Sequence, residues 1–141
     1  MRAAIGGLAA AAVLVAGCGG SGTSNADQIK KVINTYYDAF ANGDSATACE
    51  QLTKNTVKSL EKQAKGRACS DVLNDALQQP DYSTIAQKLK NAKISKITVL
   101  NDKATAQIDV PGVHGKGVIR TAVALQKEGN SWKIATALRS R

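Results

Sequence analysis

The sequence has one histidine, few acidic residues and no apolar run long enough to cross a bilayer. The only histidine, His114, lies in a glycine-flanked loop far in sequence from every cysteine, so a thiol paired with a histidine base is not expected. The apolar run from Ala3 to Ala16 is shorter than the ~20 residues that span a membrane. The sequence also has no nucleic-acid-binding motif and no internal repeat. These absences argue against a transmembrane helix, a cysteine–histidine enzyme and a nucleic-acid-binding protein.

The apolar run is instead typical of a secretory signal peptide. Arg2 supplies the positive start, small residues precede the cleavage position, and Cys18 follows Ala16 and Gly17 directly. The pattern resembles the lipobox of bacterial lipoproteins, in which the cysteine is lipidated and becomes the new N-terminus. We therefore predict a lipoprotein signal peptide over residues 1–17, a lipid anchor on Cys18 and a flexible tether through residue 25. The mature protein would be held at the extracytoplasmic face of the cell membrane; a plain signal peptide followed by a chance cysteine is the alternative.

Cys49 and Cys69 are the two thiols that remain once Cys18 carries lipid. An exported domain meets oxidising conditions, so the two are expected to form a disulfide, with free thiols as the alternative. The loop that it closes, about 20 residues, is worth ~3 kcal/mol in the chain-entropy description. With a single histidine, these two thiols are too few for a zinc site, and no metal or cofactor is expected.

Basic residues exceed acidic ones, 19 against 11, and the excess lies in one half of the mature chain. Residues 18–80 hold seven basic and seven acidic side chains, whereas residues 81–141 hold eleven and four. Such asymmetry can attract an anionic surface, and lipid head groups or wall polymers are the nearest candidates for an anchored protein. A solvated basic surface that aids solubility is the alternative.

Helical periodicity runs through residues 24–77. Ser24 or Asn25 can cap a first helix, which the turn Asn42-Gly43-Asp44 ends, and Asp44 can cap a second. A third stretch runs from Thr53 to Lys65, and a fourth from Cys69 to Leu77, before Gln79 and Pro80. The first helix has a broad apolar stripe made of Ile29, Val32, Ile33, Tyr36, Tyr37 and Phe40. Four helices are therefore expected in the first half of the mature chain.

The period changes to two after Ile94. Residues 94–100 and 104–110 predict a hairpin around Asn101-Asp102-Lys103, and residues 118–127 and 131–138 predict another around Glu128-Gly129-Asn130. Residues 26–141 therefore predict a single α+β domain, with the helices covering one face of a curved antiparallel sheet of about four strands. The alternation places on the core face the residues Ile119, Thr121, Val123, Leu125, Trp132, Ile134, Thr136 and Leu138.

The other face of these two strands has a floor of small residues with a basic rim. The floor consists of Ala122, Ala124, Ala135 and Ala137, and the rim of Arg120, Lys133 and Arg139. An apolar face with a charged rim can mark a contact surface, although chance placement in an alanine-rich chain explains it equally well. It predicts a weak homodimer or a docking site for an acidic partner.

Two segments resemble the nuclear-transport-factor-2-like (NTF2-like) superfamily. Residues 36–44, an aromatic helix ending in an Asn-Gly-Asp turn, are similar to the first helix of that superfamily, and residues 129–134 to its last hairpin. With Cys18 and the spacing of Cys49 and Cys69, the mature chain is similar to small exported lipoproteins of this superfamily from actinobacteria. The resemblance implies a cone-shaped fold whose mouth holds an apolar ligand in many members.

Three functions are compatible with these observations. The first is a non-catalytic binding module for a small apolar or lipid-like ligand, with Tyr36, Tyr37, Phe40 and Trp132 as candidate lining. The second is an assembly protein that uses the outer sheet face. The third is an isomerase-like enzyme, which the resemblance suggests because Tyr36 precedes Asp44 by eight residues; residues 54–69, however, offer no carboxylate in an apolar setting. We expect a binding module rather than an enzyme.

Overall fold

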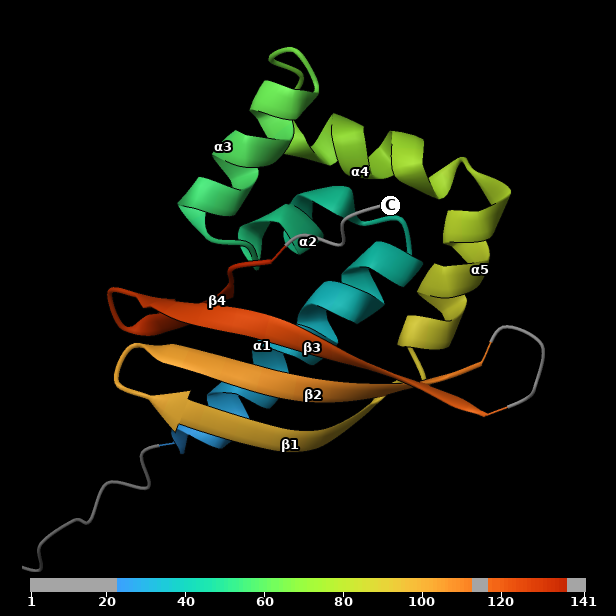
Figure 1. Ribbon diagram of the computed structural model, residues 1–141. Coiled ribbons are helices and arrows are strands. Elements are labelled where there is room, and N and C mark those ends of the chain that lie inside the picture. Colours follow the sequence, from blue (N-terminus) through green and yellow to red (C-terminus); the bar gives the residue numbers. More distant parts are fainter. Residues whose placement is uncertain (1–22, 113–116, 137–141) are drawn as a thin grey trace, which may run out of the picture.

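The computed structural model describes residues 23–112 and 117–136, and within them five helices pack on a four-stranded antiparallel sheet (Figure 1). This arrangement confirms the predicted α+β class. The signal peptide, Cys18, His114, Ala137, Leu138 and Arg139 lie outside the described residues. No helix within the described part of the chain is long and apolar enough to cross a membrane.

The first three helices are α1 (Asn25–Ala41), α2 (Ser45–Glu50) and α3 (Lys54–Gln63). Each begins at a side chain that accepts a hydrogen bond from the first turn: Ser24 from the Asp27 amide, Asp44 from the Thr47 amide and Thr53 from the Thr56 amide. Gly43, with φ +78°, makes the reversal between α1 and α2, a conformation that favours glycine. These ends agree with the predicted ones because capping is a local property.

The other two helices are α4 (Cys69–Leu77) and α5 (Pro80–Leu89). The sequence analysis did not predict α5, because it treated Pro80 as a helix stop. Pro80 is instead the first residue of α5, where its missing N–H leaves no bond unmade and its fixed φ suits the helix. The prediction of four helices was therefore wrong by one.

The sheet consists of β1 (Lys93–Leu100), β2 (Lys103–Pro111), β3 (Val118–Glu128) and β4 (Ser131–Ile134), hydrogen-bonded in that order. Its inner face, which α1 covers, buries alternate residues of β2 such as Ala106 and Ile108. Val123, Leu125, Trp132 and Ile134 are buried on the same face, as predicted.

Three residues predicted to be core-facing are exposed. Strand β4 pairs only with residues 125–128 of β3, so Ile119 and Thr121 are paired with β2 but have no described strand on their other side, and Ile119 is 53% exposed. Thr136 lies beyond β4, which ends at Ile134. The carbonyl of Ala135 accepts a hydrogen bond from the Thr56 hydroxyl (3.0 Å) and does not continue the pairing with β3. The Ala124 amide donates instead to Thr136 Oγ1 (3.0 Å). Side-chain hydrogen bonds thus end a strand that alternation alone would extend.

Candidate functional site

A disulfide joins two of the helices above the sheet. Cys49 at the end of α2 and Cys69 at the start of α4 are bonded through their sulfur atoms, which lie 2.02 Å apart. The Ser45 hydroxyl, buried on α2, donates to Asn74 Oδ1 on α4 at 2.6 Å and supports the same contact. The predicted cysteine pair therefore fixes α4 over α2.

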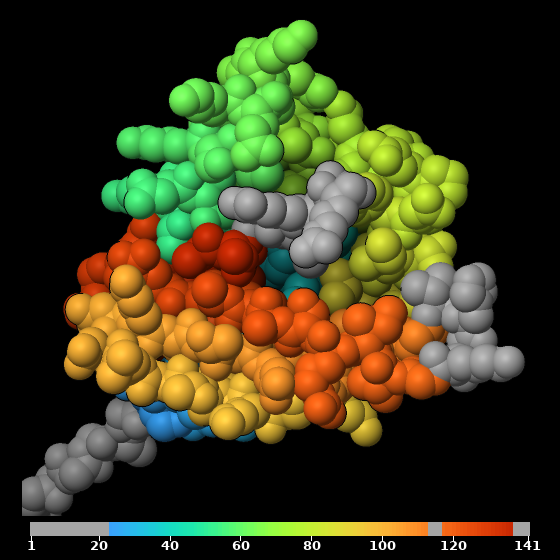
Figure 2. Space-filling view, in the orientation of Figure 1, coloured from blue at the N-terminus to red at the C-terminus, as the bar shows by residue number. Residues whose placement is uncertain are grey.

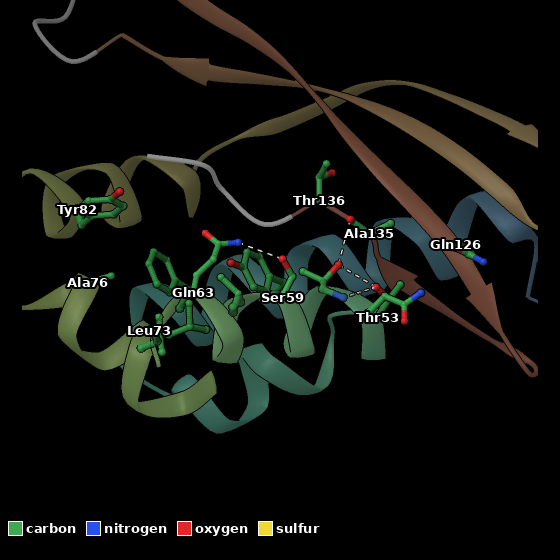
Figure 3. Close-up of a pocket in the computed structure, with 16 residues that line it drawn as sticks. Thr53, Ser59, Gln63, Leu73, Ala76, Tyr82, Gln126, Ala135 and Thr136 are labelled. Carbon is green, nitrogen blue, oxygen red and sulfur yellow. Dashed lines mark hydrogen bonds between the residues drawn. The ribbon is translucent and has the colours of Figure 1, made fainter. Parts of the chain in front are cut away.

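The main cavity lies between this helical layer and the β3–β4 end of the sheet, and its volume is about 910 Å³ (Figure 3). Helices α3, α4 and α5 supply one side, α1 the floor, and β3 with the residues after β4 the other side. Its lining consists of Tyr36, Phe40, Thr53, Asn55, Thr56, Ser59, Leu60, Gln63, Ala64, Val72, Leu73, Ala76, Tyr82, Gln126, Ala135 and Thr136.

The floor of the cavity is aromatic. Tyr36 and Phe40, one turn apart on α1, have parallel rings with centroids 6.1 Å apart, and both are buried. Leu73 of α4 and the half-buried Tyr82 of α5 extend the apolar surface across the helical layer. This part of the cavity suits hydrocarbon or an aromatic ring.

The polar lining lies mainly along α3. Gln63 donates to Ser59 Oγ at 3.1 Å, as Figure 3 shows, and the Thr53 and Thr56 hydroxyls lie 2.8 Å apart. These groups are amides and hydroxyls, and among residues 23–112 and 117–136 no Asp, Glu, Lys, Arg or His lines the cavity. The cavity therefore offers neutral hydrogen-bonding groups on one side and apolar surface on the other.

The two tyrosines of α1 are held neutral by burial. Burial raises the pKa of Tyr36 to about 12, and burial together with the neighbouring Tyr36 raises the pKa of Tyr37 further still. The Tyr37 hydroxyl is buried and has no hydrogen-bond partner among the described residues. Because phenols with raised pKa values are poor proton donors, this pair offers no acid or base suited to neutral pH.

The structure separates the four aromatic residues that were predicted to line a ligand site. Tyr36 and Phe40 line the cavity, whereas Tyr37 and Trp132 are not among its lining residues. Trp132 packs in the core, 1% exposed, and its indole N–H donates to Asn25 Oδ1 at 3.2 Å.

Sequence reasoning missed the contribution of α3, α4 and α5, including Ser59, Gln63 and Tyr82. One signal for α5 was present: Tyr82, Ile85, Ala86 and Leu89 follow Pro80 with the spacing of a helical stripe. Val72, Leu73 and Ala76 of α4 also have the spacing of a helical stripe, but whether such a stripe faces a cavity or a filled core depends on how the helices pack.

A second hollow, of about 430 Å³, lies over α2, α3 and β4. The described residues around it include three lysines and three glutamates, whose formal charges cancel: Lys54, Lys58, Lys133, Glu50, Glu61 and Glu128. Among residues 23–112 and 117–136, no group of three or more His, Cys, Asp and Glu side chains is placed to hold a metal ion.

Comparisons with known proteins agree with this architecture. The profile of a family described as "Domain of unknown function (DUF4878)" matches residues 16–135. No curated protein matches the sequence significantly. A Campylobacter jejuni protein, provisionally named an NTF2-like transpeptidase, has a similar structure at 17% identity, with 81% of this chain and 100% of that chain covered and a TM-score of 0.54.

An NTF2-like protein of unknown function from Shewanella oneidensis is similar at 16% identity, with 79% and 95% covered and a TM-score of 0.47. At such identities a likeness concerns the fold alone, and the similarity to the Campylobacter jejuni protein shows that this chain has an NTF2-like fold.

Proposed function

Because the chain belongs to the DUF4878 family, whose description assigns no activity, and has an NTF2-like fold, we propose a function from its cavity and its N-terminal pattern. The protein is a lipid-anchored, extracytoplasmic binding module, and its cavity takes an uncharged, largely apolar or lipid-like small molecule. This proposal places the lipid on Cys18 and the ligand between α1 and the helical layer.

One observation carries the ligand class: the described residues that line the cavity have no formal charge. A pocket for a charged metabolite normally places an opposite charge or a metal inside it, because an unpaired charge is costly to remove from water. Here Tyr36, Phe40 and Leu73 offer apolar surface, and Ser59 and Gln63 offer neutral polar groups. A molecule with an apolar body and a hydroxyl, ester or amide end matches both.

The same lining supports a non-catalytic role. Proton transfer needs a group whose pKa lies near the working pH, and the phenol of Tyr36 has a pKa of about 12. No carboxylate or imidazole lies among the described lining residues to serve as a partner. Binding without turnover is the function that this set of side chains supports best.

Native mass spectrometry of the protein purified from its own membrane tests the ligand. We expect a bound small molecule that is retained by the wild-type protein and lost from Ala76→Phe, because the added ring enters the cavity at the lining residue Ala76. The matched control is Ala46→Phe, at an exposed position of α2 outside the cavity, which should keep the ligand. Equal retention by both variants would place the ligand elsewhere.

A separate variant tests the anchor. Cys18→Ala removes the thiol to which lipid would attach, so the chain should be released or remain as the uncleaved precursor. Fractionation and the mass of the N-terminal fragment measure the outcome. Membrane-bound Cys18→Ala at the normal processed size would contradict the anchor and leave the ligand proposal standing.

A further inference from the structure

The face of the sheet opposite α1 is free of helices and forms the lower part of the front surface in Figure 2. The strand register aligns its residues in rows across β1, β2 and β3. We call this surface the outer face: Lys93, Lys96, Thr98, Leu100, Lys103, Thr105, Gln107, Asp109, Arg120, Ala122, Ala124 and Gln126.

The outer face is basic. Lys93, Lys96, Lys103 and Arg120 are exposed, and the only carboxylate among its residues is Asp109. That carboxylate is already paired, because Arg120 Nε donates to Asp109 Oδ1 at 2.8 Å. Lys93 lies opposite Asp109 in the strand register, whereas Lys96 and Lys103 have no carboxylate opposite them among the outer-face residues. The surface therefore attracts anions and repels a second copy of itself across a two-fold axis.

One end of the outer face adjoins the start of α1, where the predicted tether joins the domain. Trp132, next to the β3–β4 turn, donates to Asn25, and the Lys127 amide donates to the Asp102 carbonyl at 2.8 Å in the β1–β2 turn. The hairpin end of the sheet therefore lies at the same end of the domain as the start of α1, as Figure 1 also shows.

The tether is short enough to restrict orientation. Ser24 follows Cys18 by six positions, and a fully extended chain covers at most ~3.5 Å per position, or roughly 20 Å in total. A lipid on Cys18 thus keeps the hairpin end of the domain within about that distance of the bilayer surface. The opposite end, where α3 and α4 meet, is farther from the attachment point.

Leu100 adds an apolar contact at this end. It is 73% exposed, the highest value among the large exposed apolar side chains, and it pairs with Lys103 across the β1–β2 turn. An exposed leucine beside a lysine is suited to the boundary between acyl chains and anionic head groups.

We propose that the outer face, led by Leu100 and Lys103, is the surface that contacts the anionic phospholipids of the membrane holding the anchor. This proposal rests on the lipid anchor of the proposed function. The proposal also implies where the cavity lies relative to the membrane, because Gln126 is paired with Lys103 on the outer face and also lines the cavity. One wall of the cavity then borders the bilayer, which suits a ligand drawn from lipid.

The test uses the lipidated full-length protein reconstituted into vesicles of phosphatidylcholine, with or without phosphatidylglycerol. Leu100→Cys supplies a single free thiol for an environment-sensitive dye, since Cys49 and Cys69 are bonded and Cys18 would carry lipid. The matched control is Lys62→Cys, on α3 at the far end of the domain. Head-group nitroxide lipids measure contact through quenching of the dye.

We expect quenching at position 100 but not at position 62, only with phosphatidylglycerol, and weakened by salt. Adding Lys96→Glu and Lys103→Glu to the labelled Leu100→Cys protein should reduce the quenching at least about fivefold, because each surface charge contributes ~1 kcal/mol. Adding Lys58→Glu and Lys62→Glu to the same labelled protein should leave the quenching unchanged. These controls carry the same charge change on α3.

Two results would overturn the proposal in distinguishable ways. Protein that floats with both kinds of vesicle yet shows equal quenching at positions 100 and 62, or no dependence on phosphatidylglycerol, refutes the outer face and spares the anchor. Protein that fails to float, with no lipid mass on the Cys18 fragment, refutes the anchor and the tether argument with it.

Discussion

The two sides of the cavity are stabilised by different kinds of contact. The largest fully buried side chains all lie on α1 or on strands of the sheet: Trp132, Phe40, Ile29, Ile33, Ile108, Leu125 and Ile134. Helices α2, α3 and α4 bury Ser45, Ala48, Thr56, Cys69 and Leu73 instead. A large apolar core thus faces a helical layer with few large apolar groups, which is fixed by one disulfide and by single hydrogen bonds such as those of Ser45 with Asn74 and of Thr56 with Ala135.

The difference teaches where rigidity and where adaptability reside in this fold. Burial of large apolar side chains gives cooperative stability, whereas a layer fixed at a few points can open locally at lower free energy. The cavity lies between the two, with α1 as its rigid floor and α3 to α5 as its adaptable wall. A lipid-like ligand of variable length would be accommodated by the wall.

The largest expected effect comes from damaging the core. Ile108→Ala should lower the free energy of unfolding by about 2–5 kcal/mol, because Ile108 is completely buried and the cavity left behind cannot collapse. Leu60→Ala, at a half-buried position lining the cavity, should cost clearly less. Urea denaturation measures both, and equal losses would contradict the comparison between core and helical layer.

Removing the disulfide should have the next largest effect, but a local one. Cys49→Ser with Cys69→Ser should lower stability by about 2–4 kcal/mol for a closed loop of this length. Hydrogen exchange should accelerate in α2 and α4 before it does in α1 and β2. Uniform acceleration would mean that the helical layer and the core unfold as one unit.

Alkaline pH should weaken the core through Tyr36. Its pKa is raised to about 12 in the folded protein, whereas an exposed tyrosine has a pKa near 10, so the unfolded chain loses its proton first as the pH rises. The contribution of Tyr36 to stability is therefore complete below about pH 10 and is lost between about pH 10 and 12, which amounts to about 2–3 kcal/mol. Tyr36→Phe should reduce this loss, which urea denaturation at several pH values measures. Equal pH profiles for the variant and the wild-type protein would show that Tyr36 titrates normally because water fills the cavity.

The smallest effect should come from the hydrogen bond between α2 and α4. Ser45→Ala removes the donor to Asn74 Oδ1 and should cost about 1 kcal/mol, since the exposed Asn74 can turn to water. Ser83→Ala, at an exposed position of α5, serves as the control. A cost near zero would assign the whole contact between the two helices to the disulfide.

Local patterns identified most of the fold. The stripe from Ile29 to Phe40, the caps at Ser24, Asp44 and Thr53, and the two hairpin turns act through neighbours in the sequence, so they could be predicted. The error at α5 was also local, because Pro80 can end one helix or begin the next.

The candidate site was less accessible to prediction. Tyr36 and Tyr37 are adjacent and equally aromatic, yet only Tyr36 lines the cavity, since successive residues of a helix point in different directions. Trp132 belongs to the core because α1 places Asn25 against its indole N–H. The uncharged character of the described lining depends on six separate segments, and no single one of them predicts it.

The sequence by itself determined the α+β class, the helix caps, the hairpins and the two cysteines that pair, because each depends on local spacing or on residue type. Only the tertiary structure decided that β4 stops at Ile134, that the floor of the cavity is Tyr36 and Phe40, and that the lysines of β1 and β2 share one open face. These features come from contacts between distant segments, such as Thr56 with Ala135, whose free energy depends on how the helices pack on the sheet.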